Sequence, residues 1–392
     1  MNPIDGRPSF LGHTAVSGVG FTDFSKASGR TVASLAAEAA LRAIEDSGLT
    51  PADVDGIVTY SLFNDSVAGQ AVATLLGIPE LTYALDLNLG GQAPCFCIAN
   101  AAMAVHTGMA RNVLVFRALN GRSGLRVGST RWNAATTQYR LPLGLTAYPQ
   151  YIALWAKRFM IETGATSHDL AAVVLRQRGH AALNSRAIQR KIIDLAEYLS
   201  SRYLVEPFRV ADCTSEVDGA VAMVVSSLPA ARDRLVPPAV IQGAAWTTPK
   251  GSGMDMADIQ SWPDYSVNCH RYLAARLWKS ARLGPAEVEV AEIYDCFSAV
   301  CLMTLEGLGL AKRGESGGFM ASSESALGGR MPVNTHGGLL CEGYLHGMNT
   351  VAEAVLQVQR RCGNRQAKNA ETVIATSGAL MDGSALVLQS DA

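Results

Sequence analysis

The start of the chain alternates apolar runs of strand length with a longer stretch of helical spacing. An apolar run at 13–20 precedes residues from about 31 to 48, whose apolar positions recur as on one face of a helix. A turn at 49–55 then leads into a second apolar run at 56–60. This order predicts strand, helix, turn and strand, which is typical of an α/β protein.

The same pattern returns in the second half of the chain. Residues 49–55 read Leu-Thr-Pro-Ala-Asp-Val-Asp, and residues 283–289 read Leu-Gly-Pro-Ala-Glu-Val-Glu before an apolar run. Asn-Leu-Gly-Gly at 88–91, ahead of an Ala-rich helix, is matched by Asn-Thr-His-Gly-Gly at 334–338, ahead of another helix. Similarity at compatible offsets indicates an internal duplication.

Each of these helices leads into an apolar strand, at 112–116 and at 372–376. Alternating helices and strands predict largely parallel sheets covered by helices. An insertion that starts rich in Gly, Ser and Thr separates the halves, and such insertions often build substrate pockets. The segment 249–265 reads as a lid-like loop or as a plain surface loop. The predicted domains are an N-terminal half, 1–121 and 204–235, an inserted loop domain, 122–203, and a C-terminal half, 236–392.

Composition narrows the classes of partner. With 392 residues and 48% hydrophobic content, the chain can bury a large core. The formal net charge of -1 provides no single-sign field that would attract nucleic acid or an anionic membrane. Residues 1–13 lack the basic and apolar regions of a secretory signal, and no run reaches the roughly 18 apolar residues of a membrane span. We expect a cytoplasmic protein without nucleic-acid or membrane partners.

The sequence lacks the signatures of common cofactors and metals. The eight cysteines form no CxxC pair, so we interpret them as reduced thiols of the core. No GxGxxG follows the first strand, and no GxxxxGK[ST] or HExxH occurs. We therefore expect no metal and no separate cofactor.

Four segments of the chain form a recognisable set of motifs. They read Asp-Val-Asp-Gly at 53–56, His-Ala-Ala-Leu-Asn at 180–184, Asp-Cys-Thr-Ser-Glu-Val-Asp-Gly-Ala at 212–220 and Ala-Glu-Ile-Tyr-Asp-Cys-Phe-Ser at 291–298. Together they resemble the thiolase superfamily, in particular its sterol carrier protein x and lipid-transfer-protein-like branch, and the resemblance extends over nearly the whole chain. The resemblance implies a five-layer αβαβα fold built from two similar halves with an inserted loop domain. It also implies a CoA-thioester substrate and a homodimer.

The chain departs from thiolases at the cysteine positions. Gly91 occupies the place of the nucleophilic cysteine, and glycine cannot form an acyl-enzyme. Neither Cys95 nor Cys97, further along the same helix, takes the place that the motif requires. The C-terminal motif has Thr376 or Ser377 where the acid/base cysteine would be. These changes argue against thiolase chemistry.

Two histidines of the family motifs are also replaced, both by tyrosine. The tyrosines that take their places are Tyr294, in Tyr-Asp-Cys-Phe, and Tyr344, in Gly-Tyr-Leu. This pattern resembles the actinobacterial steroid side-chain aldolases. The resemblance implies retro-aldol cleavage of a β-hydroxyacyl-CoA with a tertiary alcohol on the steroid five-membered ring, giving a 17-keto steroid and propionyl-CoA or acetyl-CoA. It further implies an accessory partner protein with zinc-ribbon and OB-fold domains.

Retro-aldol cleavage removes the β-hydroxyl proton, holds enolate charge on the thioester oxygen and protonates the carbanion. A tyrosine, with a reference pKa near 10, suits the first step if its site lowers that value. We predict Tyr294 as the base and Tyr344 as its relay or as the proton donor to carbon. His346 could orient a tyrosine or aid proton transfer. The alternative is that both tyrosines are structural aromatics.

Five further residues are candidates for substrate binding. Gly91, Gly338 and Gly378 allow close backbone approach, so that amides near them could hold the thioester oxygen, although turns alone would also explain them. His336 and Ser377 lie beside these glycines in sequence.

Two other functions remain open at this level. One is a thiolase or acyltransferase that uses an unorthodox cysteine, such as Cys95 or Cys296. The other is a binding module that carries lipid or acyl-CoA without turnover. Composition does not separate them from the aldolase.

Overall fold

The computed structural model describes residues 7–124, 137–250 and 262–391. Most of the segment 249–265, interpreted as a lid-like or plain surface loop, lies outside the described residues. Within them, no helix is both long and apolar enough to cross a membrane.

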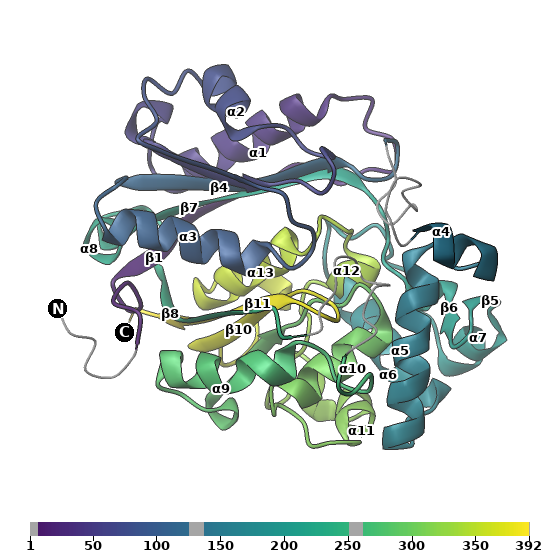
Figure 1. The fold of residues 1–392 in the computed structure, drawn as a ribbon. Coiled ribbons are helices and arrows are strands. Elements are labelled where there is room, and N and C mark those ends of the chain that lie inside the picture. Colours follow the sequence, from purple (N-terminus) through teal and green to yellow (C-terminus); the bar gives the residue numbers. More distant parts are fainter. Residues whose placement is uncertain (1–6, 125–136, 251–261, 392) are drawn as a thin grey trace.

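Helices and strands alternate in five layers (Figure 1). One outer layer holds α1 (Val32–Asp46) and α2 (Gly69–Leu76). The first strand layer contains β1 (Thr14–Phe21), β2 (Gly56–Tyr60), β3 (Tyr83–Leu87), β4 (Asn112–Asn120) and β7 (Asp218–Ser227). The central layer holds α3 (Pro94–His106) and α13 (Met348–Val358). The second strand layer contains β8 (Ala239–Thr247), β9 (Val290–Glu292), β10 (Thr372–Ser377) and β11 (Gly383–Ser390). The other outer layer holds α9 (His270–Ala281) and α10 (Ser298–Gly307). The predicted thiolase-like α/β fold is confirmed.

The duplication is visible in the order of the strands. The first half runs β2-β4-β7-β1 and the second runs β9-β10-β11-β8, with the same parallel and antiparallel pairings in both. The two strand layers join where β1 pairs with β8, at Ala15 with Val240 and Val16 with Ala239. The two halves therefore face each other across α3 and α13.

The prediction of largely parallel sheets is wrong, because in the nine-stranded sheet of the described residues five strand pairs are antiparallel and three are parallel. β10 and β11 are joined by a short turn at Gly378, where φ is +101°. Only antiparallel strands can be joined in this way. The sequence pattern located β1, β2, β4 and β10, and it gave no information on the direction of the strands.

The apolar run after residues 283–289 forms only a short strand, Val290–Glu292, so that Tyr294 lies beyond its end. The next two backbone N–H groups donate to side chains: that of Ile293 to Asn334 Oδ1 at 2.6 Å, and that of Tyr294 to Thr376 Oγ1 at 2.8 Å. Tyr294 therefore stands in a loop at the carboxyl end of β9, outside the ladder.

The inserted segment lies to one side of the layers (Figure 1). Its helices are α4 (Thr137–Arg140), α5 (Tyr148–Thr163), α6 (Ser167–Ala181) and α7 (Leu195–Ser200), and a small hairpin of β5 (Tyr203–Val205) and β6 (Phe208–Arg209) follows. The remaining short helices are α8 (Leu228–Arg232), α11 (Ser316–Ala321) and α12 (Gly338–Cys341).

The core lies on both sides of the central helices. Every residue of α13 is buried, as expected for a helix between two strand layers. These residues include the polar Asn349, Glu353 and Gln357, so the middle of the molecule also holds a network of buried polar groups.

Candidate active site

Two of the predicted catalytic residues meet in the structure. The hydroxyl oxygens of Tyr294 and Tyr344 lie 2.7 Å apart, and their rings make an angle of 66°. Both side chains are buried. Burial raises the pKa of each phenol well above its usual value, and the neighbouring tyrosine raises that of Tyr294 further. The lowered tyrosine pKa that the sequence interpretation required is thus not found, and both phenols keep their protons at neutral pH.

The backbone holds both tyrosines in place. Tyr294 is fixed by its bond to Thr376 at the end of β10. Tyr344 lies between α12 and α13, and its N–H donates to the carbonyl of Ser215 at 2.8 Å. Three distant parts of the chain therefore bring the two hydroxyl groups together.

Gly91 makes room for Tyr294. A Cβ atom at position 91 would lie 1.9 Å from Tyr294 Oη, so no residue with a side chain fits at position 91 while Tyr294 keeps its place. A Cβ on Gly347, whose φ is +85°, would lie 2.7 Å from Tyr294 Cδ2. The loss of the cysteine and the gain of the tyrosine are thus one steric change. Sequence reasoning missed Gly347, although a glycine three residues after a candidate tyrosine was an available signal.

His346 lies beside the pair. The centroids of the His346 and Tyr344 rings lie 5.0 Å apart, and the ring planes make an angle of 83°. The Nδ1 of His346 lies 2.7 Å from Nη2 of Arg117, which also donates to Asp65 at 2.6 Å. Burial and the charge of Arg117 lower the pKa of His346 to about 3. The imidazole is therefore neutral.

Comparison with known proteins agrees with this geometry. The family described as thiolase C-terminal domain-like matches residues 251–390. A 17-hydroxy-3-oxo-4-pregnene-20-carboxyl-CoA lyase of Mycobacterium tuberculosis is 41% identical over 96% of this chain and 99% of its own length. A steroid side-chain-cleaving aldolase of Thermomonospora curvata is 40% identical over 97% of this chain and 98% of its own. The chain belongs to the steroid side-chain-cleaving aldolases of the thiolase superfamily.

Solved structures agree with this assignment. A structure described as an Ltp2-ChsH2(DUF35) aldolase has a TM-score of 0.92 at 39% identity, and the match covers 98% of this chain and 99% of that one. Human mitochondrial 3-ketoacyl-CoA thiolase, with a TM-score of 0.71 at 16% identity, matches 97% of this chain and all of its own, and shares the fold.

The cysteines of the aldolase are poorly suited to nucleophilic chemistry. Burial raises the pKa of Cys95 to about 12, and it raises those of Cys97 and Cys296 as well. The thiolate is the nucleophilic form, so these thiols are inert at neutral pH. Ser377 contacts Cys95 instead of the tyrosines: it accepts from the Cys95 N–H and donates to Cys95 Sγ, both at 3.2 Å.

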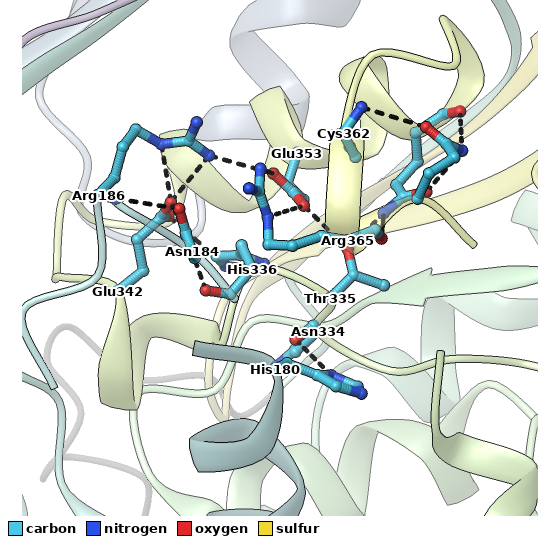
Figure 2. A network of polar contacts seen from close by, with 12 residues as sticks. His180, Asn184, Arg186, Asn334, Thr335, His336, Glu342, Glu353, Cys362 and Arg365 are labelled. Carbon is cyan, nitrogen blue, oxygen red and sulfur yellow. Dashed lines mark hydrogen bonds and ion pairs between the residues drawn. The ribbon is translucent and has the colours of Figure 1, made fainter. Parts of the chain in front are cut away.

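His336, predicted to bind substrate, lies in a buried ion network (Figure 2). Its Nδ1 is 2.9 Å from Glu292 and its Nε2 is 4.0 Å from Glu342. Burial alone would lower the pKa of His336, but the carboxylates of Glu342, Glu292 and Glu353 outweigh this effect and raise it to about 9. His336 is therefore an imidazolium bound to protein carboxylates.

The two remaining candidate glycines meet other protein groups. A Cβ at Gly338 would lie 2.2 Å from Asp295 Oδ2 and 2.6 Å from Gln177 Oε1, and one at Gly378 would lie 2.3 Å from the Asp382 carbonyl. Asp295 itself accepts from the Leu339 N–H through Oδ1 at 2.9 Å. Close packing explains both glycines, so the structure groups Gly91 and His346 with the tyrosines and holds the other candidates elsewhere.

Proposed function

We propose that this aldolase is a retro-aldol carbon–carbon lyase that cleaves a β-hydroxyacyl-CoA steroid side chain to a 17-keto steroid and propionyl-CoA or acetyl-CoA. The observation that carries the proposal is the pair of neutral phenols, Tyr294 and Tyr344, hydrogen-bonded at 2.7 Å where a thiolase would have its nucleophile. The name of the mycobacterial relative, a 17-hydroxy-3-oxo-4-pregnene-20-carboxyl-CoA lyase, supports this substrate class.

The protonated pair suits a proton relay better than a free base. Tyr294 takes the β-hydroxyl proton as its own proton moves to Tyr344, and Tyr344 passes a proton to the α-carbon. The bond between the α- and β-carbons breaks, and its electron pair enters the thioester as an enolate before the α-carbon is protonated. The β-carbon becomes the ketone. Each tyrosine ends with one proton, so no phenolate has to persist in a site that disfavours one.

This chemistry requires neither an acyl-enzyme nor a separate cofactor. CoA enters as part of the substrate. The protonated state of Cys95 and Cys296 argues against the alternative of an unorthodox thiolase or acyltransferase.

The test is an assay of ketone release from a β-hydroxyacyl-CoA steroid for the wild type, Tyr294→Phe and Tyr344→Phe. We expect each variant to lose about 10²- to 10⁴-fold in kcat, the usual contribution of an acid or base. The matched control is Tyr198→Phe, since Tyr198 is a buried tyrosine whose hydroxyl binds Asp212. Cleavage unaffected by both substitutions would instead favour a site without tyrosine chemistry, and no cleavage by the wild type would favour a binding module.

The proposal includes a homodimer in the cytoplasm with an accessory zinc-ribbon and OB-fold partner. The DUF35 component named with the solved relative supports such a partner. Half of the exposed large hydrophobic side chains among the described residues lie in 122–203. Leu154 and Ile161, 60% and 70% exposed, stand on one face of α5.

The assay should therefore be run with and without a DUF35 partner, and the partner's binding measured by co-purification. We expect Leu154→Glu with Ile161→Glu to abolish co-purification. Leu75→Glu, an equally exposed leucine on α2, is the control. Binding that survives the double substitution would exclude this face of α5.

A further inference from the structure

We propose that His346 is a neutral hydrogen-bond donor to the thioester oxygen of the substrate, and that Arg117 is the positioning residue that fixes its tautomer. This inference rests on the proposed function and deepens it. The two tyrosines account for the proton path, whereas the enolate charge on the thioester oxygen also needs a donor.

Arg117 determines which nitrogen of His346 carries the proton. The side chain of Arg117 is fully buried on β4, and its Nη1 donates to the carbonyl of Tyr60 at 2.8 Å. Its Nη2 faces Asp65 Oδ2 at 2.6 Å and His346 Nδ1 at 2.7 Å. A guanidinium has no acceptor and does not lose its proton in proteins. Nδ1 must therefore present its lone pair, which leaves the proton of the neutral ring on Nε2.

The orientation of the ring is fixed as well. The backbone of His346 has a φ of +52°, which is unusual for a residue other than glycine, and the hydroxyl of Tyr60 donates to its carbonyl at 3.3 Å. The imidazole stacks on the Tyr60 ring at 28° and meets Tyr344 edge-on. These contacts keep the imidazole next to the tyrosine pair.

The Nε2–H group remains available for a ligand. The Nε2 atoms of His180, His270 and His336 are enclosed without a hydrogen-bond partner, and that of His346 is not among them. Among the described residues, no group accepts a hydrogen bond from His346 Nε2. An imidazole that is held through Nδ1 and has Nε2–H free is suited to donate a hydrogen bond to an oxygen of the substrate.

The charged and titratable neighbours favour the neutral form. Arg117 faces the ring from β4 and Asp65 from the loop after β2, and Tyr60 and Tyr344 flank it. Because Asp65 pairs with Arg117 at 2.6 Å and lies 4.0 Å from Nδ1, its charge offsets only part of the effect of Arg117 on the pKa of His346. A neutral N–H stabilises developing negative charge without protonating it at the wrong atom.

Substitution by glutamine distinguishes a donor from a base. We expect His346→Ala to lower kcat by about 10²- to 10³-fold, as for the loss of an oxyanion donor. The amide N–H of His346→Gln can replace Nε2–H, so that variant should stay within about 10-fold of the wild type. If Gln and Ala are equally poor while the wild type cleaves, the donor role is wrong. If the wild type does not cleave, the proposed function fails first.

A second measurement tests the tautomer without any turnover. In protein labelled with ¹⁵N in the histidine rings, the His346 signals, assigned by their absence in His346→Gln, should report a neutral ring with the proton on Nε2 from pH 8 to pH 5. In Arg117→Met with Asp65→Asn, which removes both charges together, His346 should titrate closer to its ordinary pKa of about 6.5. A wild-type proton on Nδ1, or a titration unchanged by the double substitution, would overturn the role of Arg117.

Discussion

His336 and His346 both lie buried in the segment between β9 and α13, but their charge states differ at neutral pH. Carboxylates surround His336 and raise its pKa to about 9, although burial opposes this. Burial and a guanidinium lower the pKa of His346 to about 3. The same residue type, at nearly the same depth, is a cation at neutral pH in one place and a neutral ring in the other. The difference fits the proposed roles, in which His336 is a cation of the core and His346 a donor at the tyrosine pair.

The two environments are also satisfied differently. The network around His336 is closed by Arg365, which is 3.1 Å from Glu353, and by Arg186, which contacts both Glu342 and Glu353 (Figure 2). Buried charges of this kind are very costly to unpair. Both rings are bound through Nδ1, but the Nε2 of His336 is enclosed, whereas that of His346 is the proposed donor to a ligand. Substitutions should therefore affect stability in the network and activity at the tyrosine site.

Of the substitutions that separate the tyrosine site from the network, Gly91→Cys is expected to have the largest effect. The new Cβ would overlap Tyr294 Oη, so the tyrosine pair must separate, and we expect a fall in kcat of about 10²- to 10⁴-fold. The restored cysteine should not restore thiolase activity. Stability should change by only about 1–3 kcal/mol, the usual cost of overpacking. Steady-state kinetics and thermal unfolding measure the two effects.

The matched control is Gly179→Cys. Gly179 lies on α6, and a Cβ there would meet no atom of the described residues within 4 Å beyond its own part of the helix, so neither activity nor stability should change appreciably. Full activity in Gly91→Cys would mean that Tyr294 is not held where the chemistry needs it.

The next largest effect is expected in the network. His336→Leu leaves Glu292 and Glu342 without their shared cation, and we expect a loss of about 3–5 kcal/mol in the free energy of unfolding. His346→Leu leaves Arg117 still paired with Asp65, so it should cost only about 1–2 kcal/mol. Denaturant unfolding of both variants compares them directly, and equal losses would contradict the assignment of separate roles.

The sequence predicted the elements from local pattern, and it singled out the tyrosines through the resemblance to the family motifs. The strands at 56–60 and 372–376 and the helix near 31–48 were located from hydrophobic periodicity. The direction of the strands was not predicted. The early end of β9 was not predicted either, because side chains of Asn334 and Thr376 replace the ladder hydrogen bonds there. These partners become neighbours only in the folded chain.

The partners of the candidate site residues could not be predicted from the sequence for the same reason. His336 and His346 look alike in sequence, since each is a lone histidine near glycines. Their roles depend on Glu292 and Arg117, which come from other strands. Arg117 could have been noticed, because a single arginine inside the apolar run of β4 must be paired if the strand is buried. Its partner could not have been predicted.

A third prediction uses pH to separate the two histidines. The pKa of His336 is raised on folding, so its stabilising contribution is complete below about pH 6.5 and is lost as the pH rises through 9. The size is on the order of 3 kcal/mol. The pKa of His346 is lowered, so its contribution is present above about pH 6.5 and is lost as the pH falls toward 3. The unfolding free energy, measured from pH 5 to 9, should lose its alkaline slope in His336→Gln and part of its acidic slope in His346→Gln. Unchanged slopes would mean that neither histidine is shifted.

The smallest effect is expected from Arg186→Gln, at the edge of the network. Arg186 is partly exposed, and Arg365 still neutralises Glu353 when it is removed, so the loss should be about 1–2 kcal/mol. With one cation fewer, the carboxylates should raise the pKa of His336 further and move the alkaline loss of stability to higher pH. Lys191→Gln, which breaks only the exposed pair with Glu197, is the control and should cost almost nothing. If Arg186→Gln instead moved that transition to lower pH, carboxylate charge would not be what keeps His336 protonated, and the contrast with His346 would need another cause.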